Sequence, residues 1–405
     1  MIMLDDLHII APDPRVHREE MFDLIAKAFS AGGYYPFLSW LKGGYIDGGF
    51  YDWRASRVGI LAGRIVTHWG VWGYTMRIGS ARVRVAGVGA VATAGEFRGR
   101  GLMQRTASVA LAAMADYGYD LSILFGIDGF YGQFGYVRAW SGCEYSVKYG
   151  DLPQGGSAPA LRRCEPLAMP QLVRLFNRHH ARATGTAVRP TYTTSDPRKG
   201  REGFMWTDGG GRPVGYVVVC DRGIRLDVVE AVGAPAQVLC AVRRLAQRYG
   251  ADDVRFETLP WDSPLARTLR MGNCTVTIHH RRDGGAMVRC VDLPRTLDRM
   301  RGELTARLRA SPLAGWHGRL LIDNGRQQAV LDIGSRGISV DAAEHAGAVS
   351  HAVRGGDAVA QLVLGTDDPL ETARCARMRL AGDARMLLPV LFPAQHPMLH
   401  AADRF

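Results

Sequence analysis

The sequence predicts an α/β fold that occurs twice along the chain and is followed by an α+β region. The first 150 residues alternate strand-like runs with two amphipathic helices, at 17–29 and about 101–117. Residues 160–288 repeat a similar order of helix, strands, helix and strand. From residue 289 the pattern changes to short alternating strands beside helices, which is typical of an α+β layout.

The individual elements follow from local periodicity and from Gly and Pro breakers. In the first region, strand-like runs lie at 57–62, 65–71, 82–86, 88–93 and 121–126, and a Gly- and aromatic-rich loop is expected at 32–53. In the second region, helices are expected near 166–180 and at 235–249, with strands at 214–220, 224–230 and 253–258. In the third region, two helices precede strands at 318–324, 328–333 and 337–341, a helix near 356–364 and a strand-like tail.

Three domains are predicted, at 1–150, 151–288 and 289–405. The stretch "GDLPQGGSAP" at 150–159 is rich in Gly and Pro and is typical of a linker. At 405 residues, with 47% hydrophobic and 22% charged residues, the chain has the composition of an ordinary globular protein of several domains.

The composition also indicates where the protein is located and whether it holds disulfides or a metal. The longest apolar runs, such as "VGYVVVC" at 214–220, are far shorter than the roughly 20 residues that span a bilayer, and the N-terminus is acidic where a signal peptide is basic. We therefore expect a cytoplasmic protein without a membrane span. The seven cysteines are scattered and form no C-x-x-C pair, so neither a disulfide framework nor a metal site is expected.

The net charge of +11 raises nucleic acid as a partner. The basic residues are spread along the chain, however, and the densest groups, such as "RRDGG" at 281–285, are short. No nucleic-acid-binding motif accompanies them, so we expect no nucleic-acid partner. The phosphate groups of a small cofactor are another use for local basic charge.

The motif of interest is "TAGEFRGRGLMQRT" at 93–106, where two glycines precede an alanine-rich helix. Glycine in a helix interior costs about 1 kcal/mol relative to alanine, so the pair favours a loop whose backbone approaches another group closely. A strand followed by R-G-x-G and a helix directs backbone N–H groups and the positive end of the helix at an anion such as a pyrophosphate. A plain structural turn is the alternative.

Two other glycine motifs fit less well. "GVGAVA" at 87–92 matches the dinucleotide pattern G-x-G-x-x-A, but that pattern belongs in a turn that opens a helix. Here the segment reads as a strand, and the helix begins about ten residues later. A P-loop is excluded because no G-K-[ST] follows the glycines.

Strand "AVAT" at 90–93, the loop at 98–103 and the helix after it resemble the acetyl-CoA-binding motif of GNAT acetyltransferases, R/Q-x-x-G-x-G/A. Met103 departs from the motif, because the last position is usually small. The segment "GFYGQFGYV" at 129–137 occupies the place of the next strand-loop element in that family. Together with the three-part chain and the final Phe, these features are similar to the Eis (enhanced intracellular survival) acetyltransferases.

That resemblance implies a catalytic GNAT domain at 1–150, a degenerate GNAT-like domain at 151–288, and a sterol-carrier-protein-like domain at 289–405 whose tail reaches the active site. It also implies acetyl-CoA as co-substrate and no metal. By analogy, a backbone N–H of Val91, Ala92 or Thr93 holds the thioester carbonyl. The N–H groups that hold the pyrophosphate are those of Arg98, Gly99, Arg100, Gly101, Leu102 and Met103.

Two residues are candidates for proton transfer. Tyr131 aligns with the tyrosine that the Eis family uses as general acid, and a phenol with a pKa near 10 is protonated at neutral pH. From the residues alone, an aromatic-glycine turn in which Tyr131 only packs is an open alternative. The resemblance implies that the carboxylate of Phe405 is the base. The apolar, proline-rich tail predicts packing rather than the fraying usual for last residues.

The resemblance further implies a homo-oligomer, a hexamer, and a primary amine as acceptor, such as an aminoglycoside or a polyamine. Trp40, with Asp47 and Asp52, is a candidate wall for a cationic amine, although Arg404 beside Asp403 makes the charge near Phe405 mixed. Two other functions stay open at this point: acetylation of a protein lysine, and non-catalytic binding of CoA or an acyl group. The second domain has no R-x-x-G loop, so we do not expect it to bind CoA.

Overall fold

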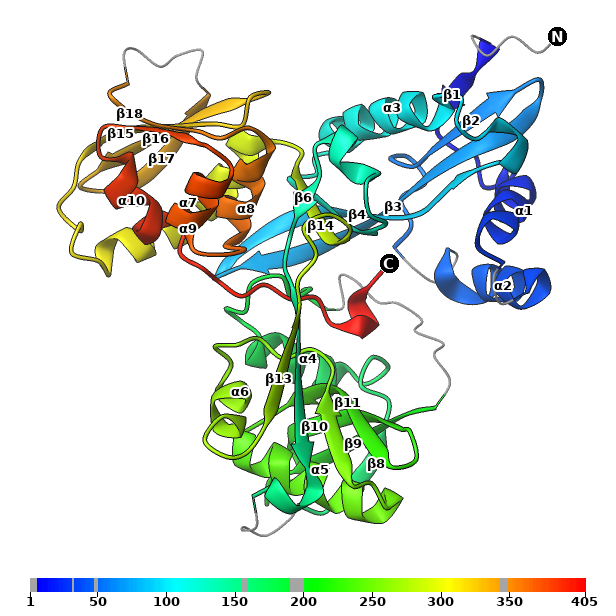
Figure 1. Cartoon of the computed structure of the whole chain (residues 1–405), viewed down its shortest axis with the longest axis vertical. Helices are drawn as coiled ribbons and strands as arrows, with labels where there is room; N and C mark the ends of the chain where they lie inside the picture. Colours follow the sequence, from blue (N-terminus) through cyan, green and yellow to red (C-terminus); the bar gives the residue numbers. More distant parts are fainter. Residues whose placement is uncertain (1–5, 31–32, 47–49, 154–158, 190–199, 343–348) are drawn as a thin grey trace.

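The structure is a computed structural model, and it describes residues 6–30, 33–46, 50–153, 159–189, 200–342 and 349–405. Three lobes meet at a central junction, and each lobe is built on its own β-sheet (Figure 1). Two of the sheets have seven strands and the third has five. This combination of α/β and α+β lobes confirms the predicted fold class.

The first lobe is a mostly antiparallel sheet with helices on both faces. Its strand order is β1-β2-β3-β4-β5-β14-β6, and β4 and β5 are parallel. The strands are β1 (His8–Ile10), β2 (Arg57–Leu61), β3 (Arg64–Ile78), β4 (Ala81–Thr93), β5 (Leu121–Gly126), β6 (Val137–Arg138) and β14 (Gly285–Cys290). The helices are α1 (Arg18–Phe29), α2 (Tyr34–Trp40), the π-helical turn η3 (Leu41–Tyr45) and α3 (Leu102–Asp116). Helix α3 connects the two parallel strands.

The second lobe repeats this arrangement. Its order, β8-β9-β10-β11-β12-β7-β13, again contains one parallel pair, β11 and β12, connected by helix α5. The strands are β7 (Gly142–Lys148), β8 (Arg162–Cys164), β9 (Arg201–Thr207), β10 (Pro213–Asp221), β11 (Arg225–Val232), β12 (Asp253–Phe256) and β13 (Thr275–His279). The helices are α4 (Pro170–His179), α5 (Pro235–Tyr249) and α6 (Pro264–Leu269).

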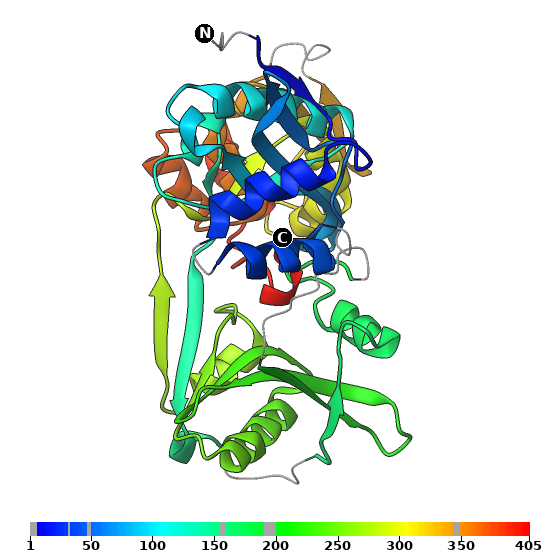
Figure 2. The same cartoon turned by 90° about the vertical axis from the view of Figure 1, so that its right-hand side faces the viewer.

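The first two lobes exchange a strand. In the second sheet, the place beside β12 is taken by β7, which follows the first lobe in sequence. In the first sheet, the corresponding place beside β5 is taken by β14, which follows the second lobe. Figure 2 shows β7 and β13 side by side on the path between the two lobes. The first sheet is therefore built from two distant parts of the chain.

The third lobe packs directly on the first. Its strands are β15 (Gly318–Asp323), β16 (Gln328–Gly334), β17 (Gly337–Ala342), β18 (His351–Arg354) and β19 (Arg379–Ala381). Its helices are α7 (Leu293–Arg309), α8 (Val359–Leu364), α9 (Pro369–Cys375) and α10 (Ala384–Leu391). Helix α7 contacts both β4 and β17, and the buried residues Leu297 and Met300 belong to one apolar core that continues into the first lobe.

Three local predictions need correction. The expected loop at 32–53 contains helix α2 and the turn η3, because its aromatic residues pack on the sheet. The runs at 82–86 and 88–93 form one strand, β4, since Gly87 continues the extended backbone. The strand-like tail contains helix α10, whose leucines Leu387, Leu388 and Leu391 are all buried on one face. The prediction that "GVGAVA" lies in a strand is confirmed.

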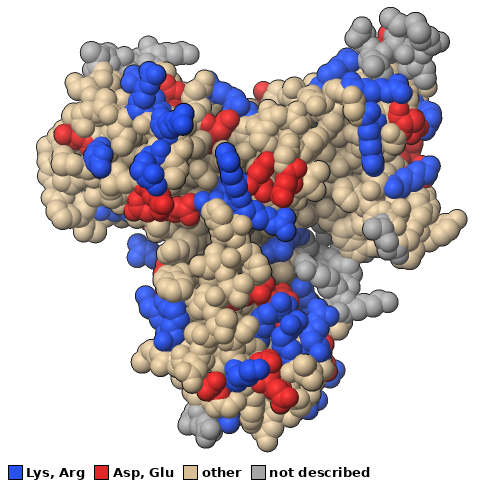
Figure 3. All heavy atoms as spheres, in the orientation of Figure 1, with Lys and Arg blue, Asp and Glu red and all other residues tan. Residues whose placement is uncertain are grey.

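Charged side chains of both signs are scattered over the face shown in Figure 3. There, Lys and Arg are interspersed with Asp and Glu over all three lobes. Within the described ranges, no helix has the combination of length and apolar character that a bilayer crossing requires.

Candidate active site

The centre of the first lobe is an opening between its two parallel strands. Within the described residues, β4 pairs with β5 only over residues 85–88, opposite residues 121–124. The remainder of β4, residues 89–93, continues along β3 without a β5 partner. The backbone of this segment therefore faces a gap that can accept an extended ligand as an additional strand.

The shape of the opening depends on a bulge in β4. The β3–β4 register shifts between His68 and Gly70, and Ala90 has a φ of 49°, in the left-handed region. His68 Nδ1 lies 2.7 Å from the carbonyl oxygen of Ala90, and His68 Nε2 lies 2.8 Å from the Tyr51 hydroxyl. Burial lowers the pKa of His68 to about 4. The ring is therefore neutral at pH 7: Nδ1–H donates to Ala90, and Nε2 accepts from Tyr51.

The glycine loop lies at the end of this segment. Gly99 and Gly101 have φ values of 71° and 74°, and Gly101 is the N-cap of α3. Apart from the two chain neighbours of each glycine, no atom of the described residues lies within 4 Å of the position that a Cβ would take there, so the loop backbone is open to a ligand. Leu102 and Met103 are only 2% and 6% exposed. Met103 packs into the core beneath α3, which explains how a large residue is accommodated at this motif position.

Tyr131 lies on the α3 side of the first sheet. It opens the 3-10 turn η5 (Tyr131–Phe134), which follows β5, and its ring packs over Gly126 at the end of β5. The ring of Trp69 is in edge contact, with the centroids 6.2 Å apart. Burial raises the pKa of Tyr131 to about 12. At neutral pH this side chain is a firmly protonated phenol.

Phe405 lies on the opposite face of the same sheet. A Cβ at Gly87 would lie 2.3 Å from Phe405 Cδ1, and the ring centroids of Tyr74 and Phe125 lie 5.7 and 5.8 Å from that of Phe405. A Cβ at Gly89 would lie 3.5 Å from the carboxyl carbon of Phe405. Because side chains alternate along a strand, Gly87 and Gly89 face this side while Val88 faces α3.

An aromatic stack borders the Phe405 side. The ring of Trp40 stacks on that of Tyr45 at 4.0 Å, and the ring of Tyr45 lies 4.8 Å from that of Trp72. A Cβ at Gly89 would also lie 2.7 Å from the Tyr45 hydroxyl oxygen, so Tyr45 and the Phe405 carboxyl group approach the same glycine. Sequence reasoning did not select Tyr45. The signal was the pair of glycines two residues apart in a strand, which indicates close approach on one face.

Asp52, a candidate wall residue, has a different setting. Its carboxylate accepts a hydrogen bond from the Tyr119 hydroxyl at 2.8 Å and another from the backbone N–H of Arg54 at 3.0 Å. These contacts close the turn before β2. Asp47, the other acidic candidate, lies outside the described residues.

A buried ion-pair network anchors the tail that ends at Phe405. Arg189 donates to both carboxylate oxygens of Asp403, at 2.7 and 2.8 Å, and to both of Glu230, at 2.9 and 2.7 Å. All three side chains are at most 3% exposed. Burial alone would raise the pKa of Glu230, but Arg189 and the Tyr216 hydroxyl hold it at about 2, whereas burial raises the pKa of Asp403 to about 6.

We expect Gly87→Ala to disturb the tail, because the added methyl group would overlap the Phe405 ring. Overpacking of this kind costs about 1–3 kcal/mol. Hydrogen exchange of the peptide 399–405, followed by mass spectrometry, should become faster. The control is Gly150→Ala, where no atom of the described residues beyond the two chain neighbours lies within 4 Å of the added carbon. Equal protection of this peptide in Gly87→Ala and the wild-type chain would contradict the prediction.

The parallel pair with its opening, the bulge in β4 and the glycine loop before α3 define the acetyl-transfer domain of GNAT enzymes. In agreement, residues 18–139 match the family model described as acetyltransferase (GNAT) domain. The protein is accordingly an acetyltransferase, and a domain of this class implies acetyl-CoA as co-substrate. No curated protein sequence matches the chain.

Solved structures of similar fold cover nearly the whole chain. A probable N-acyltransferase from Enterococcus faecalis superposes with a TM-score of 0.76 at 19% identity, covering 98% of this chain and 99% of that one. A GCN5-related N-acetyltransferase from Kribbella flavida superposes with a TM-score of 0.73 at 21% sequence identity, covering 99% of this chain and 98% of that one. Eis1 from Mycobacterium abscessus superposes with a TM-score of 0.69 at 18% sequence identity, covering 98% of this chain and 100% of that one. At these identities the likeness concerns the fold alone.

Proposed function

We propose that the protein is an acetyl-CoA-dependent N-acetyltransferase of the Eis type, which acetylates a primary amine by direct transfer in a ternary complex. The observation that carries the proposal is the opening between β4 and β5, with Tyr131 against one face of the sheet and Phe405 against the other. A protonated phenol on one face and a carboxylate on the other suit acetyl transfer, because the departing thiolate gains a proton and the attacking amine loses one.

The residues around the opening fit acetyl-CoA. When bound, acetyl-CoA supplies the acetyl group as a thioester. The β4 backbone at Val91, Ala92 and Thr93 would hold the carbonyl oxygen and stabilise the negative charge that develops there. The loop at 98–103 would hold the pyrophosphate through backbone N–H groups, for which the open positions at Gly99 and Gly101 leave room.

Tyr131 would act as general acid toward the departing sulfur, and the carboxylate of Phe405 would accept the proton of the amine, directly or through water. The surroundings support both roles. Burial keeps the Tyr131 phenol protonated, and the Arg189 network holds Asp403, two residues before Phe405.

The acceptor we propose is a small amine such as an aminoglycoside or a polyamine. A cavity of about 510 Å³ lies beside Arg404, next to the tail. Its lining includes the acidic residues Glu144, Glu257 and Asp367. Asp367 is paired with Arg138, and Arg255 lies 3.6 Å from both Glu144 and Glu257. Trp40 offers an aromatic face to a cation on the Phe405 side. The hexamer and the sterol-carrier-like third domain stay predictions from the resemblance.

The experiment that tests the proposal follows thiol release from acetyl-CoA with an aminoglycoside panel, a polyamine and a lysine peptide. It compares the wild-type chain with Tyr131→Phe and with a chain lacking Phe405. We expect the wild-type chain to acetylate a small amine, and we expect both changes to lower the rate of thiol release. Preference for the lysine peptide would favour a protein substrate, and acetyl-CoA binding without turnover of any acceptor would favour a binding role.

The raised pKa of Tyr131 predicts an unusual pH profile. The protonated phenol is the active form, so activity is lost only as the pH rises through about 12. An ordinary tyrosine would be half ionised near pH 10. We expect kcat at pH 10 to be no lower than at pH 8, measured with an acceptor amine of low pKa that is already fully deprotonated at pH 8. A fall in kcat with an apparent pKa near 10, the same for two acceptors, would contradict the raised pKa of Tyr131.

A further inference from the structure

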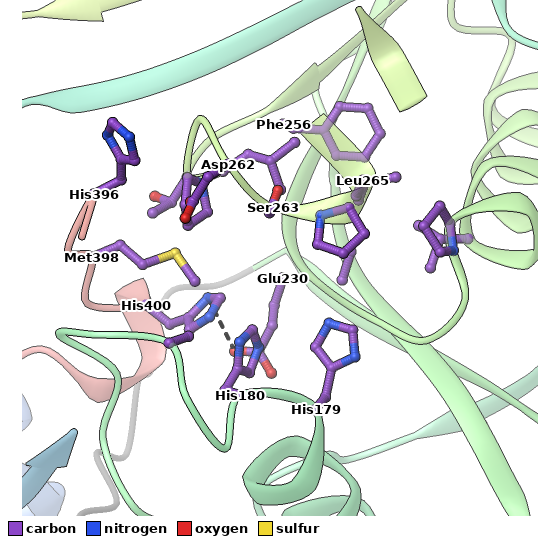
Figure 4. Close-up of a pocket in the computed structure, with 18 of the residues that line it drawn as sticks. His179, His180, Glu230, Phe256, Asp262, Ser263, Leu265, His396, Met398 and His400 are labelled. Atoms are coloured by element: carbon purple, nitrogen blue, oxygen red, sulfur yellow. Dashed lines mark ion pairs between the residues drawn. The ribbon is translucent and has the colours of Figure 1, made fainter. Parts of the chain in front are cut away.

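The second lobe contains an opening of the same kind as the first. Strand β11 pairs with β12 over residues 225–228, and within the described residues its last part, 229–232, has no β12 partner. A cavity of about 410 Å³ lies at this place. Its walls come from β11, the start of α5, the loop before α6 and the tail segment at 395–400 (Figure 4).

The cavity is not built for a phosphate group. In the first lobe a glycine loop separates β4 from α3, but here α5 begins at Pro235, three residues after the end of β11. Pro235 has no N–H to offer at the first helical position. A Cβ at Gly233 would lie 3.1 Å from the Trp206 ring, so this glycine serves packing rather than an open loop.

Two buried histidines present unused ring nitrogens to the cavity. His180 and His400 are 7% and 3% exposed, and their ring centroids lie 4.9 Å apart. His180 Nε2 and both ring nitrogens of His400 have no hydrogen-bond partner in the described part of the chain. Glu230 Oε2 lies 3.9 Å from His400 Nδ1, which is too far for a hydrogen bond (Figure 4). Arg189 donates to both Glu230 oxygens. Buried polar atoms without partners are costly, so these nitrogens indicate a missing hydrogen-bonding group.

The charge of the cavity is balanced. Burial lowers the pKa of His400 to about 4 and that of His180 well below its ordinary value, so both rings are neutral at pH 7. Glu230 is neutralised by Arg189. The other charged residues of the lining, Arg182 and Asp262, are exposed and opposite in sign. A charged ligand would therefore lose its hydration without gaining an opposite charge.

The rest of the lining combines the polar residues His179, Thr184, Thr258, Ser263, Gln395 and His396 with a large apolar part. The apolar part includes Val228, Val238, Phe256, Leu265 and Met398. A neutral imidazole offers one N–H donor and one acceptor nitrogen, and a hydroxyl or carboxamide group offers the same combination. Polar groups of this kind on an apolar body match both the histidines and the walls.

We propose that the second-lobe cavity binds an uncharged amphipathic small molecule, whose hydroxyl or carboxamide group hydrogen-bonds to His180 and His400 and whose apolar body packs between β11, α5 and α6. The cavity lies at the parallel pair of the second lobe and not at the opening between β4 and β5, although it shares Thr258, Leu259 and Pro260 with the cavity proposed for the acceptor amine. It does not depend on the acetyltransferase function.

The test uses the full chain and two neutral probes, benzyl alcohol and benzamide, observed by saturation-transfer NMR. Three control probes of similar shape are ethylbenzene, which lacks the polar group, and the charged benzoate and benzylamine. We expect the two neutral polar probes to bind, to compete with each other, and to exceed the three controls at least tenfold in affinity. Binding of benzoate or benzylamine with equal affinity, or binding of none of the probes, would overturn the proposal.

Two variants locate the site. His400→Phe keeps the ring shape but removes both nitrogens, and it should weaken benzamide binding at least tenfold. Thr258→Trp, at a half-buried position of the lining, should block the cavity from the other side. His279→Phe changes an exposed histidine on β13 and is the matched control. Unchanged affinity in both His400→Phe and Thr258→Trp would place the probe elsewhere and refute the site.

A measurement on the unmodified sequence avoids any folding defect of the variants. In protein labelled with ¹⁵N-histidine, benzamide should shift the imidazole nitrogen signals of His180 and His400 at constant pH and leave that of His279 in place. Benzamide binding without movement of the two buried histidine signals would refute the proposed contacts.

Discussion

Replacing Arg189 by methionine is expected to lower the free energy of unfolding by about 3–5 kcal/mol. The guanidinium group is 1% exposed and holds two buried carboxylates, on Glu230 and Asp403, that come from the second lobe and from the tail. Without it, two negative charges remain buried side by side and lose the guanidinium group that hydrogen-bonds to both. Urea unfolding at pH 7 measures the loss, and hydrogen exchange of the peptide 399–405 should rise at the same time.

The control for this prediction is an exposed ion pair. Arg163 pairs with Glu202 at the surface, where Arg163 is 70% exposed, and Arg163→Met should change stability by less than about 1 kcal/mol. A triple variant removes the uncompensated charges by adding Glu230→Gln and Asp403→Asn to Arg189→Met. It should regain part of the lost free energy of unfolding. A loss below 1 kcal/mol for Arg189→Met alone would show that the network does not hold the tail.

Tyr131→Phe is expected to reduce kcat about a hundredfold to ten-thousandfold, the range in which a general acid contributes. The ring stays in place over Gly126, so the affinity for acetyl-CoA should change less than about twofold. Thiol release at saturating concentrations of both substrates gives kcat, and equilibrium titration with acetyl-CoA gives the affinity. A loss confined to kcat is the signature of a group that acts in the transition state.

Tyr136→Phe is the matched control, because it removes a tyrosine hydroxyl two residues after the same turn, η5. Tyr136 is 2% exposed, and its hydroxyl lies 2.7 Å from Ser122 Oγ. The change should cost about 1 kcal/mol of stability and leave kcat within about threefold. An equal fall of kcat in both variants would mean that the turn, and not the Tyr131 hydroxyl, matters.

Local features of the first lobe were predictable from sequence. The helix after Gly101 and the strand over "GVGAVA" follow from glycine chemistry and β-branched runs within a few residues. Helix α2 was missed, because its aromatic residues fold as a helix only against the sheet and resemble a loop when read alone. Tertiary packing overrides local propensity in such segments.

The long-range features were beyond local reasoning. Arg189 meets Glu230 and Asp403 across 41 and 214 positions of sequence, and no periodicity links them. The exchange of β7 and β14 could not be predicted for the same reason, because the residue pattern of each strand is compatible with a place in either sheet. Tyr45 could have been inferred only indirectly, from the two glycines of β4 that leave space for it.

The exchanged strands also restrict the order in which the chain can fold during synthesis. The ribosome completes residues 8–138 of the first sheet early, but β14, at 285–290, follows only after the whole second lobe. Until then, the edge of β5 lacks its partner and is open to wrong pairing, a hazard that chaperones limit. The second lobe, which already has β7, can form first. The acetyl-transfer domain, although N-terminal, is therefore expected to mature after the domain that follows it.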